Sequence, residues 1–418
     1  MHYIIEGGKK LSGQVTLSGN KNSVLPCMAA ALLTEDEIVL SNVPDITDVD
    51  VFTEIFKKLG IGIKRKKDKI YIKAKKILET ELPDELVKKL RASILLAGPI
   101  FARKRKVSFT FPGGDKIGKR SIDIHLQGFK SLGAIISKLS DVYFISKAKK
   151  NPIKKIRIFL GEASVTATEN LILASVLSES KITIRNAATE PHVYDLCKLL
   201  NQMGAKINGV GTNSLKISGV KKLKGAEFRV SDDHINFGTY AIASAITNSK
   251  LKIICDKNTD LEPVIEALGK FGIKFDWENN GFLVFSERIV CSEKIVTNIW
   301  PGFPTDLMSS TIVLASQAEG STLCHDWMFE KRMEFVKNLI KMGADISIID
   351  SSKVFVKGKS NLSGHDFESS DLRSGMALVL AALIAKGVST INNAELIERG
   401  YEDVAGSLSS LGANIKMS

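Results

Sequence analysis

The segment Lys58-Leu59-Gly60-Ile61 ends an amphipathic stretch and leads directly into an alternating one, and this arrangement recurs along the chain. The other copies are Ser131-Leu132-Gly133-Ala134, Gln202-Met203-Gly204-Ala205, Lys270-Phe271-Gly272-Ile273, Lys341-Met342-Gly343-Ala344 and Ser410-Leu411-Gly412-Ala413. Successive glycines in these segments are 68 to 73 residues apart. A repeat of about 70 residues cannot bury a core of its own, so the six repeats must pack against one another.

The residues around Gly60 predict the structure of one half of a repeat. Between residues 51 and 59, apolar side chains fall on one stripe of a helix. Gly60 follows, where helices commonly end on a left-handed residue. Residues 61–63 and 70–72 alternate apolar and polar side chains on either side of a charged turn, which predicts a β-hairpin.

The other half of each repeat predicts a helix of small residues followed by a strand. Alanine gathers at residues 29–31, 241–245 and 381–385, and a strand pattern follows each time. Because alanine permits close approach of backbones, we expect these helices at a shared centre with the sheets outside. A chain of 418 residues exceeds one ordinary core, and six repeats divide as three plus three. The sequence therefore predicts an α/β protein of two domains.

Composition limits the class of partner. The chain holds 58 Lys and Arg against 46 Asp and Glu, a net charge of +12. Much of the excess lies in runs at residues 64–67, 103–106 and 147–155, which we interpret as solvent-exposed hairpin tips. A nucleic-acid surface is an alternative, although the runs contain no aromatic residues. Attraction of small anionic substrates is another.

Cysteine usage and hydropathy indicate the compartment. The five cysteines are an odd number without a CxxC pair, which predicts reduced thiols and argues against a zinc site or a disulfide framework. The first residues lack the pattern of a signal peptide. The longest apolar runs are about ten residues, against roughly 20 for a membrane helix. We therefore expect a cytoplasmic protein without a membrane partner.

Residues 112–120, Pro-Gly-Gly-Asp-Lys-Ile-Gly-Lys-Arg, form a glycine-rich charged segment. It nearly matches a phosphate-binding GxxxxGK[ST] loop, but Arg120 stands where the Mg²⁺-binding hydroxyl is needed, which argues against nucleotide triphosphatase activity. A charged surface loop is one interpretation. A mobile basic lid is the other, with cations for an anion and Asp115 at its tip.

The segment at residues 18–23, Ser-Gly-Asn-Lys-Asn-Ser, precedes a helix that we expect to begin near Val24. Lys21 beside a helix N-terminus suits an anion. The ordinary interpretation of the segment is a surface turn that caps the helix through Asn or Ser.

Other polar residues also allow structural interpretations. Arg91 alone would be a salt-bridging helix residue, and Asp306 after Pro304 would be a helix N-cap. Two further arginines, in Asp371-Leu372-Arg373 and Glu398-Arg399, are expected near helix starts.

Taken together, these segments resemble the UDP-N-acetylglucosamine 1-carboxyvinyltransferases, the enolpyruvyl transferases that begin bacterial peptidoglycan synthesis. The resemblance covers essentially the whole chain and implies two inside-out α/β barrels of three repeats each. We expect one domain over residues 22–231, which carries the lid, and a second over residues 1–21 and 232–418. The resemblance rests on Ser18-Gly19-Asn20-Lys21-Asn22, Leu90-Arg91-Ala92-Ser93, Pro112-Gly113-Gly114, Ile117-Gly118, Arg120, Ser164-Val165, Glu190-Pro191, Phe303-Pro304-Thr305-Asp306, Asp371-Leu372-Arg373 and Arg399-Gly400-Tyr401-Glu402.

The resemblance implies transfer of the enolpyruvyl group of phosphoenolpyruvate to the 3′-hydroxyl of UDP-N-acetylglucosamine, with release of phosphate by addition and elimination. Asp306 is the candidate base and Asp115 the candidate acid, with Lys21 as a further catalytic residue. Lys21, Arg120 and Arg399 would hold phosphoenolpyruvate, and Arg373 would assist. The UDP-sugar and its neighbourhood would be lined by Asn22, Arg91, Ser121, Ile122, Asp123, Ile124, Ser164, Val165, Asp306 and Met328.

The resemblance implies no metal and no organic cofactor, and we expect a monomer without a nucleic-acid partner. Two positions depart from the family pattern. Thr166 stands where the family commonly has Gly, and Glu162 where a Lys is often found near the diphosphate. Both departures are expected to weaken UDP-sugar binding.

Asp115 also departs from the family pattern, which commonly has Cys at the lid tip. A thiol with a pKa of about 8.5 is mostly protonated at pH 7, whereas a free carboxyl with a pKa of about 3.9 is not. Lys116, Lys119 and Arg120 would favour the ionised carboxylate. Burial against the phosphoenolpyruvate anion could raise the pKa of Asp115 enough for it to act as an acid. Without the thiol, we expect resistance to fosfomycin, which alkylates that group.

Three alternatives stay open. The sister transferase 5-enolpyruvylshikimate-3-phosphate synthase shares the fold and phosphoenolpyruvate, although the Asn20-Lys21-Asn22 and lid segments favour the UDP-sugar enzyme. A nucleic-acid-binding protein would explain the positive charge. A non-catalytic paralogue would bind the UDP-sugar and regulate.

Overall fold

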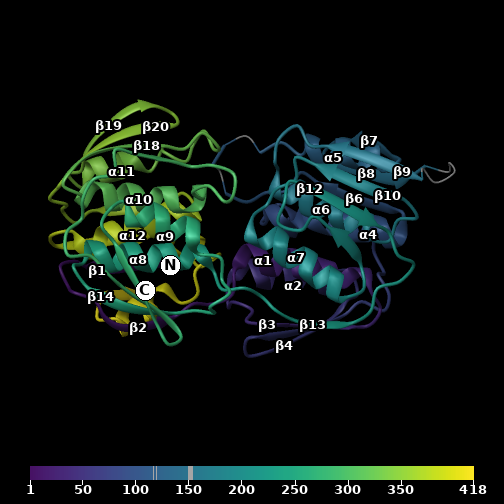
Figure 1. Cartoon of the computed structure of the whole chain (residues 1–418), viewed down its shortest axis with the longest axis horizontal. Helices are drawn as coiled ribbons and strands as arrows, with labels where there is room; N and C mark the ends of the chain where they lie inside the picture. The colour runs from purple at the N-terminus through teal and green to yellow at the C-terminus, as the bar shows by residue number, and fades with distance from the viewer. Residues whose placement is uncertain (116, 119, 149–153) are drawn as a thin grey trace. The chain divides into compact units, whose positions relative to one another are not determined.

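The computed structural model describes residues 1–115, 117–118, 120–148 and 154–418. The chain divides into two compact units (Figure 1). Unit 1 comprises Met1–Ser18, Asp115–Lys119 and Asp232–Ser418, and unit 2 comprises Gly19–Gly114 and Arg120–Ser231. The domain bounds given above stay a prediction. Lys116, Lys119 and residues 149–153 of the third basic run lie outside the described residues.

Unit 1 contains three four-stranded sheets. Their strand orders are β21-β22-β1-β23, β15-β16-β14-β2 and β17-β18-β20-β19. The strands are β1 (His2–Glu6), β2 (Ser12–Thr16), β14 (Lys250–Ile254), β15 (Lys274–Glu278), β16 (Gly281–Phe285), β17 (Lys294–Val296), β18 (Gly320–His325), β19 (Asp345–Asp350), β20 (Lys353–Gly358), β21 (Asp366–Glu368), β22 (Val388–Asn392) and β23 (Asn414–Met417).

Unit 2 contains two four-stranded sheets, β11-β12-β10-β9 and β13-β3-β5-β4, and the three-stranded sheet β6-β8-β7. Where a fourth strand would lie beside β6, Glu81 forms a single parallel bridge with Ser108. The strands are β3 (Glu37–Ser41), β4 (Gly62–Lys66), β5 (Lys69–Lys73), β6 (Lys106–Thr110), β7 (Ala134–Leu139), β8 (Val142–Lys147), β9 (Lys155–Phe159), β10 (Lys181–Arg185), β11 (Lys206–Asn208), β12 (Ser214–Ser218) and β13 (Ala226–Arg229).

One pairing scheme is common to the four-stranded sheets. A strand such as β14 pairs in parallel with β2 on one side and antiparallel with β16 on the other, and β16 pairs antiparallel with β15. In the sheet β21-β22-β1-β23 the corresponding antiparallel pair is β1 and β23, which are not consecutive in the chain. The hairpin predicted after Gly60 is β4 and β5, with Ile63 opposite Ile72. The chain passes between the units four times, after Ser18, Gly114, Lys119 and Ser231. The strands β1 and β2 therefore belong to unit 1 although unit 2 follows them in sequence.

Each repeat carries one inner and one outer helix. The inner helices are almost entirely buried, and α10 packs against both α8 and α12, which Figure 1 shows between the sheets of unit 1. The inner helices are α1 (Lys21–Ala30), α4 (Ala97–Lys104), α6 (Val165–Ser175), α8 (His234–Ile246), α10 (Thr305–Gln317) and α12 (Leu372–Ile384). The predicted α/β architecture with small-residue helices inside and sheets outside is confirmed.

The outer helices are amphipathic, and each ends at one of the repeated glycine segments. In α2, Phe52, Ile55 and Phe56 are fully buried, as the stripe predicted. The outer helices are α2 (Thr47–Lys58), α5 (Asp123–Ser131), α7 (Pro191–Gln202), α9 (Glu262–Gly269), α11 (Val336–Lys341) and α13 (Val404–Ser410), with a further short helix α3 (Asp84–Val87). The six repeated glycines all have φ between 77° and 104°, the left-handed conformation that ends each helix.

Two local expectations need correction. The helix expected to begin near Val24 begins at Lys21, because the side chain of Asn20 accepts hydrogen bonds from the N–H groups of Asn22 and Ser23. The run at residues 103–106 is not a hairpin tip but the junction of α4 and β6, where Arg103 donates to the carbonyls of Leu32 and Ala74. In the described part of the chain, no helix is long and apolar enough to cross a membrane.

The left-handed glycines predict a large difference between two nearby substitutions in unit 1. Gly272→Ala should destabilise unit 1 by about 2 kcal/mol, since φ is +82° and a Cβ would lie 2.6 Å from the carbonyl oxygen of Arg288. The matched control Gly269→Ala ends α9, has open space around a Cβ, and should leave stability unchanged or raise it by up to about 1 kcal/mol. Urea unfolding of both variants measures this; equal midpoints would contradict it.

Candidate active site

Asp306 lies in the first turn of α10 and pairs with two arginines of unit 1. Arg332 Nη2 donates to its Oδ1 at 3.0 Å, and Arg373 Nε and Nη2 donate to its Oδ2 at 3.0 and 2.9 Å. The arginine side chains are only 2% and 3% exposed, whereas the carboxylate is 26% exposed. Such charge-assisted bonds stabilise the ionised carboxylate. The alternative that Asp306 caps α10 is wrong, since the N-cap is Pro304.

The arginine pair keeps unused hydrogen-bond donors. Arg332 Nε and Arg373 Nη1 are buried, and no partner for them lies among the described residues. The guanidinium of Arg373 also lies 5.2 Å from the ring centre of Tyr401. Buried donors without acceptors are costly, so this corner of unit 1 is electrostatically prepared for a further anion.

A second carboxylate–arginine pair lies in the glycine-rich segment. Arg399 Nη1 donates to Asp115 Oδ1 at 2.5 Å, and both side chains are largely buried. The adjacent backbone is also held in unit 1, because the Lys331 N–H donates to the Ile117 carbonyl at 3.0 Å. Gly118 has a φ of +146°, a backbone conformation that favours glycine.

His234, at the start of α8, faces the same electrostatic environment. Burial lowers its pKa to about 4, the Asp306 charge partly opposes this, and Arg373 adds to it. The ring contacts Trp300 edge-on with centroids 5.1 Å apart. Burial raises the pKa of Tyr401, whose hydroxyl lies 3.1 Å from the Thr239 hydroxyl. Both groups are therefore neutral near pH 7.

Unit 2 holds Lys21 at the first position of α1. Its Nζ lies 2.8 Å from Asp48 Oδ2, and both side chains are nearly buried. The backbone N–H of the neighbouring Asn22 is occupied by the Asn20 cap. The lysine is thus held beside a helix N-terminus, an arrangement suited to an anion.

Arg91 is a buried cation of unit 2, and no ion pair between it and a carboxylate is found among the described residues. Its Nη2 donates to the Ser121 carbonyl at 2.9 Å, and its guanidinium lies 5.4 Å from the Phe111 ring. Burial lowers its pKa to about 10, and the nearby charge of Arg120 adds to this effect. Ser121 in turn donates to Asp123 at 2.6 Å, at the start of α5. The interpretation of Arg91 as a salt-bridging helix residue is therefore wrong.

His125, the third residue of α5, links this region to α6. Its Nε2 lies 3.2 Å from Thr166 Oγ1 and its Nδ1 3.1 Å from Asn170 Nδ2. Burial and, to a smaller extent, the charge of Arg91 lower its pKa to about 3. Ser164 caps α6 by accepting from the Ala167 N–H at 3.4 Å, which leaves Val165 and Thr166 as the first residues of the helix.

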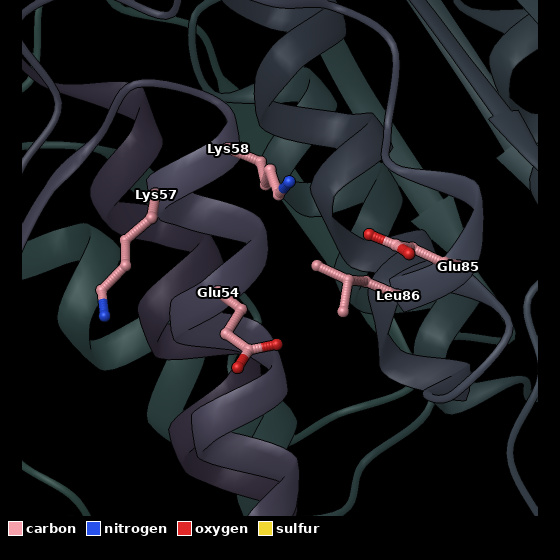
Figure 2. Close-up of a pocket in the computed structure, with 5 residues that line it drawn as sticks. All are labelled: Glu54, Lys57, Lys58, Glu85 and Leu86. Atoms are coloured by element: carbon pink, nitrogen blue, oxygen red, sulfur yellow. The ribbon is translucent and has the colours of Figure 1, made fainter.

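A surface cavity of about 420 Å³ lies apart from these residues. Figure 2 shows its lining, with Glu54, Lys57 and Lys58 on α2 and Glu85 and Leu86 on α3. The charged residues are exposed and of mixed sign, and none is a predicted site residue. Among the residues that the structure describes, no group of three metal-ligating side chains occurs.

Comparison with known proteins identifies the family. The model of the EPSP synthase (3-phosphoshikimate 1-carboxyvinyltransferase) family matches residues 5–408. Proteins named UDP-N-acetylglucosamine 1-carboxyvinyltransferase are 46% identical in Borrelia garinii subsp. bavariensis, with 99% of this chain and 98% of the relative covered, and 42% identical in Bradyrhizobium diazoefficiens, with 100% and 98% covered. This chain belongs to the UDP-N-acetylglucosamine 1-carboxyvinyltransferase family.

Solved structures agree with the fold of this transferase. The enolpyruvyl transferase NikO from Streptomyces tendae has a TM-score of 0.89 at 22% identity, covering 99% of this chain and 98% of the other. An EPSP synthase from Acinetobacter baumannii has a TM-score of 0.77 at 18% identity, covering 100% and 99%. These likenesses support the two-domain α/β architecture.

The structure brings several predicted residues of the transferase into contact and adds residues that sequence reasoning missed. Asp306 contacts Arg373, Asp115 contacts Arg399, and Arg91 contacts Ser121. Met328 donates its N–H to the buried Asp326, which also accepts from the Thr305 hydroxyl next to Asp306. The missed residues are Arg332, Asp48, His125, Asp326 and Tyr401; of these, only Tyr401 stood in a segment quoted for the resemblance.

The buried His125 predicts a loss of stability in acid. The unfolded chain protonates it below a pKa of about 6.5, whereas the folded protein does so only near 3, so stability falls as the pH drops below about 6.5. At pH 5 the loss is about 2 kcal/mol. Urea unfolding from pH 8 to pH 5 should show a steeper loss in the wild type than in His125→Asn. If the free energy of unfolding falls by the same amount from pH 8 to pH 5 in both proteins, the prediction is contradicted, whatever the stability of His125→Asn at pH 8.

Proposed function

We propose that this chain transfers the enolpyruvyl group of phosphoenolpyruvate to the 3′-hydroxyl of UDP-N-acetylglucosamine and releases phosphate, a step of peptidoglycan precursor synthesis. Full-length relatives that carry the name of this activity support the proposal. We extend it to a cytoplasmic enzyme that serves cell-wall growth, cell shape, the cell cycle and cell division. The observation that carries the residue roles is that each of two carboxylates is paired with arginine.

Asp306 is proposed as the base that takes the proton of the 3′-hydroxyl. A base must be ionised, and Arg332 and Arg373 stabilise that form. The same pairing lowers basicity, since proton uptake would remove the nearest negative charge from two buried arginines, and Asp371 lies 4.0 Å from Arg332. Arg373 is also proposed to assist phosphoenolpyruvate binding. If it turns its free donors to that anion, Asp306 recovers basicity when the substrate is present.

Asp115 is proposed as the acid that protonates the methylene carbon. Arg399 donates a hydrogen bond to Asp115, and such charge-assisted bonds favour the ionised carboxylate. Arg399 is also proposed to bind phosphoenolpyruvate. The substrate anion would then compete for Arg399 and add a like charge near Asp115, and both changes favour the protonated acid. Binding of phosphoenolpyruvate would thereby favour the protonated form of Asp115, the proposed proton donor.

The remaining residues are assigned to the two substrates by the charge and polarity of their side chains. Lys21 and Arg120 would bind the phosphate or carboxylate of phosphoenolpyruvate, as cations beside reacting anions do in phosphate-releasing enzymes. The UDP-sugar is assigned to residues that offer hydrogen-bond donors, apolar contact and one further cation. These residues are Asn22, Arg91, Ser121, Ile122, Asp123, Ile124, Ser164, Val165 and Met328.

The proposal is tested by phosphate release from phosphoenolpyruvate with UDP-N-acetylglucosamine, with shikimate 3-phosphate and without an acceptor. Only the UDP-sugar should support release. Asp306→Asn should lower kcat by at least about 100-fold, the lower range for loss of a general base. The control Glu54→Gln removes an equal charge at the cavity of Figure 2 and should match the wild type. Equal rates with shikimate 3-phosphate would refute the substrate assignment.

The lid residue makes a separate prediction about inhibition. Fosfomycin alkylates a thiol, so the wild type with Asp115 should keep its activity after incubation with fosfomycin, while Asp115→Cys should lose it with time. Asp115→Asn should have low activity whether or not fosfomycin is added, because an amide supplies no acidic proton. Residual activity is measured after removal of free inhibitor. Inactivation of the wild type at the rate of Asp115→Cys would show that another group reacts.

A further inference from the structure

The outer face of the sheet β11-β12-β10-β9 in unit 2 carries positive charge alone. Its inner face is apolar and buried, with Ile182 and Ile184 on the central strand β10. The residues that alternate with these lie on the opposite face, and strand pairing brings them together there. Six of them are exposed cations, namely Lys155, Arg157, Lys181, Arg185, Lys206 and Lys216. The remaining strand residues of this face, all described by the structure, are Phe159, Thr183, Asn208, Ser214 and Ser218, and none is a carboxylate.

This face, called the β9–β12 face below, differs in charge from the other four-stranded sheets. Their outer faces mix both signs, with Glu37 opposite Lys73 in one sheet and Asp345 opposite Lys357 in another. The further carboxylates on those faces are Glu227, Asp276, Glu278, Asp350, Glu6, Asp366 and Glu368. On the β9–β12 face, by contrast, Lys155 lies opposite Lys181, and like charges so placed repel.

The cations of the β9–β12 face are not neutralised within the described part of the chain. None of the six forms an ion pair with a described carboxylate. Their side chains are exposed and extend from one rigid sheet, so their fields add over the whole face. A surface of this kind is complementary to an extended anionic partner and not to a single small anion, for which no cavity is found among these residues.

Exposed apolar side chains lie beside these cations. Phe159, which pairs with Arg185, is 71% exposed. On the sheet β6-β8-β7, Ile135, Leu139 and Phe144 are 59%, 71% and 40% exposed, and strand pairing places them on one face. The helix α5 packs against both β7 and β9, and Figure 1 shows these strands together in unit 2. Cations combined with exposed apolar side chains are typical of proteins that lie on an anionic membrane surface.

A single-stranded nucleic acid is the other extended anion that a cationic sheet can bind. Sheets that do so stack successive bases on two or three aromatic side chains. Of the described strand residues on the β9–β12 face, Phe159 alone is aromatic, and it lies on the edge strand β9. The exposed aliphatic side chains of Ile135 and Leu139 offer no stacking surface. The observations therefore favour a lipid bilayer over a nucleic acid.

We propose that unit 2 binds the surface of an anionic lipid bilayer through the β9–β12 face. The six cations contact the phosphate-bearing headgroups, and Phe159 with the exposed apolar side chains of β7 and β8 reaches the boundary of the acyl chains. This reverses the expectation of a protein without a membrane partner. The contact is peripheral and reversible, goes beyond the proposed function and does not rest on it.

Cosedimentation of the full chain with lipid vesicles tests the proposal. Vesicles of phosphatidylglycerol and phosphatidylcholine in equal parts should bind the wild type, whereas phosphatidylcholine alone should not. Binding should weaken as NaCl rises from about 0.05 to about 0.5 M, because salt screens the attraction. The double variant Arg157→Gln, Lys181→Gln should bind about 30-fold more weakly, since each cation near an anionic surface contributes about 5-fold. Leu139→Ser should weaken binding about 5-fold through lost apolar burial.

The matched control is the double variant Lys64→Gln, Lys73→Gln. It removes two exposed cations from the outer face of another sheet of unit 2 and should stay within about 3-fold of the wild type. Urea midpoints of both double variants should equal that of the wild type, which separates lost binding from unfolding.

Several results would overturn the proposal. One is wild-type chain that stays in the supernatant with anionic vesicles at low salt, and another is equal binding to phosphatidylcholine alone. Equal weakening in the control variant would show that net charge and not the β9–β12 face is responsible. Tighter binding of polyuridine RNA than of vesicles, lost in Arg157→Gln, Lys181→Gln but kept in Leu139→Ser, would assign the face to nucleic acid instead.

Discussion

The chemistry of unit 1 depends on one interaction, the pairing of two nearly buried guanidinium groups with a half-buried carboxylate. Arg332 and Arg373 have given up most of their hydration, and Asp306 supplies the counter-charge that makes this tolerable. Asp306 is therefore a structural residue as well as a candidate base. Each arginine keeps one buried donor nitrogen for which the described residues offer no acceptor, and a further anion could accept from these donors.

The proposed acid, Asp115, is likewise paired with an arginine. Asp115 and Asp306 lie in different parts of the sequence, yet each is paired with arginine. In the proposed mechanism, each carboxylate is protonated more readily once its arginine binds another anion. A substrate with two negatively charged groups is well suited to such an exchange. This coupling would keep proton transfer dependent on the presence of phosphoenolpyruvate.

The sequence predicted the repeat and its helix ends well, because these depend on local chemistry. The glycines of the six repeated segments need no tertiary information, since a left-handed residue after an amphipathic stretch is a local requirement. The start of α1 was predicted near Val24, three residues late, whereas the Asn20 cap sets the start at Lys21. Asp306 and Arg373 were found from segments that resemble the family.

Other site residues could not be found in this way. Arg332 lies in a run of charged residues that reads as exposed, and only tertiary packing buries it against Asp306. Asp48 looks like an ordinary acidic residue in the first turn of α2, but it holds Lys21. The polar contacts of His125 come from Thr166 and Asn170, which lie 41 and 45 residues away in the chain.

The strand exchange between units has a consequence for biosynthesis. β2 pairs with β14, and β1 with β22, so these first strands leave the ribosome long before their partners exist. Unit 2 is nearly continuous in sequence and can assemble while unit 1 waits for its last repeat. During that interval the unpaired strands β1 and β2 can form hydrogen bonds with other chains, and chaperones should be needed most at this stage.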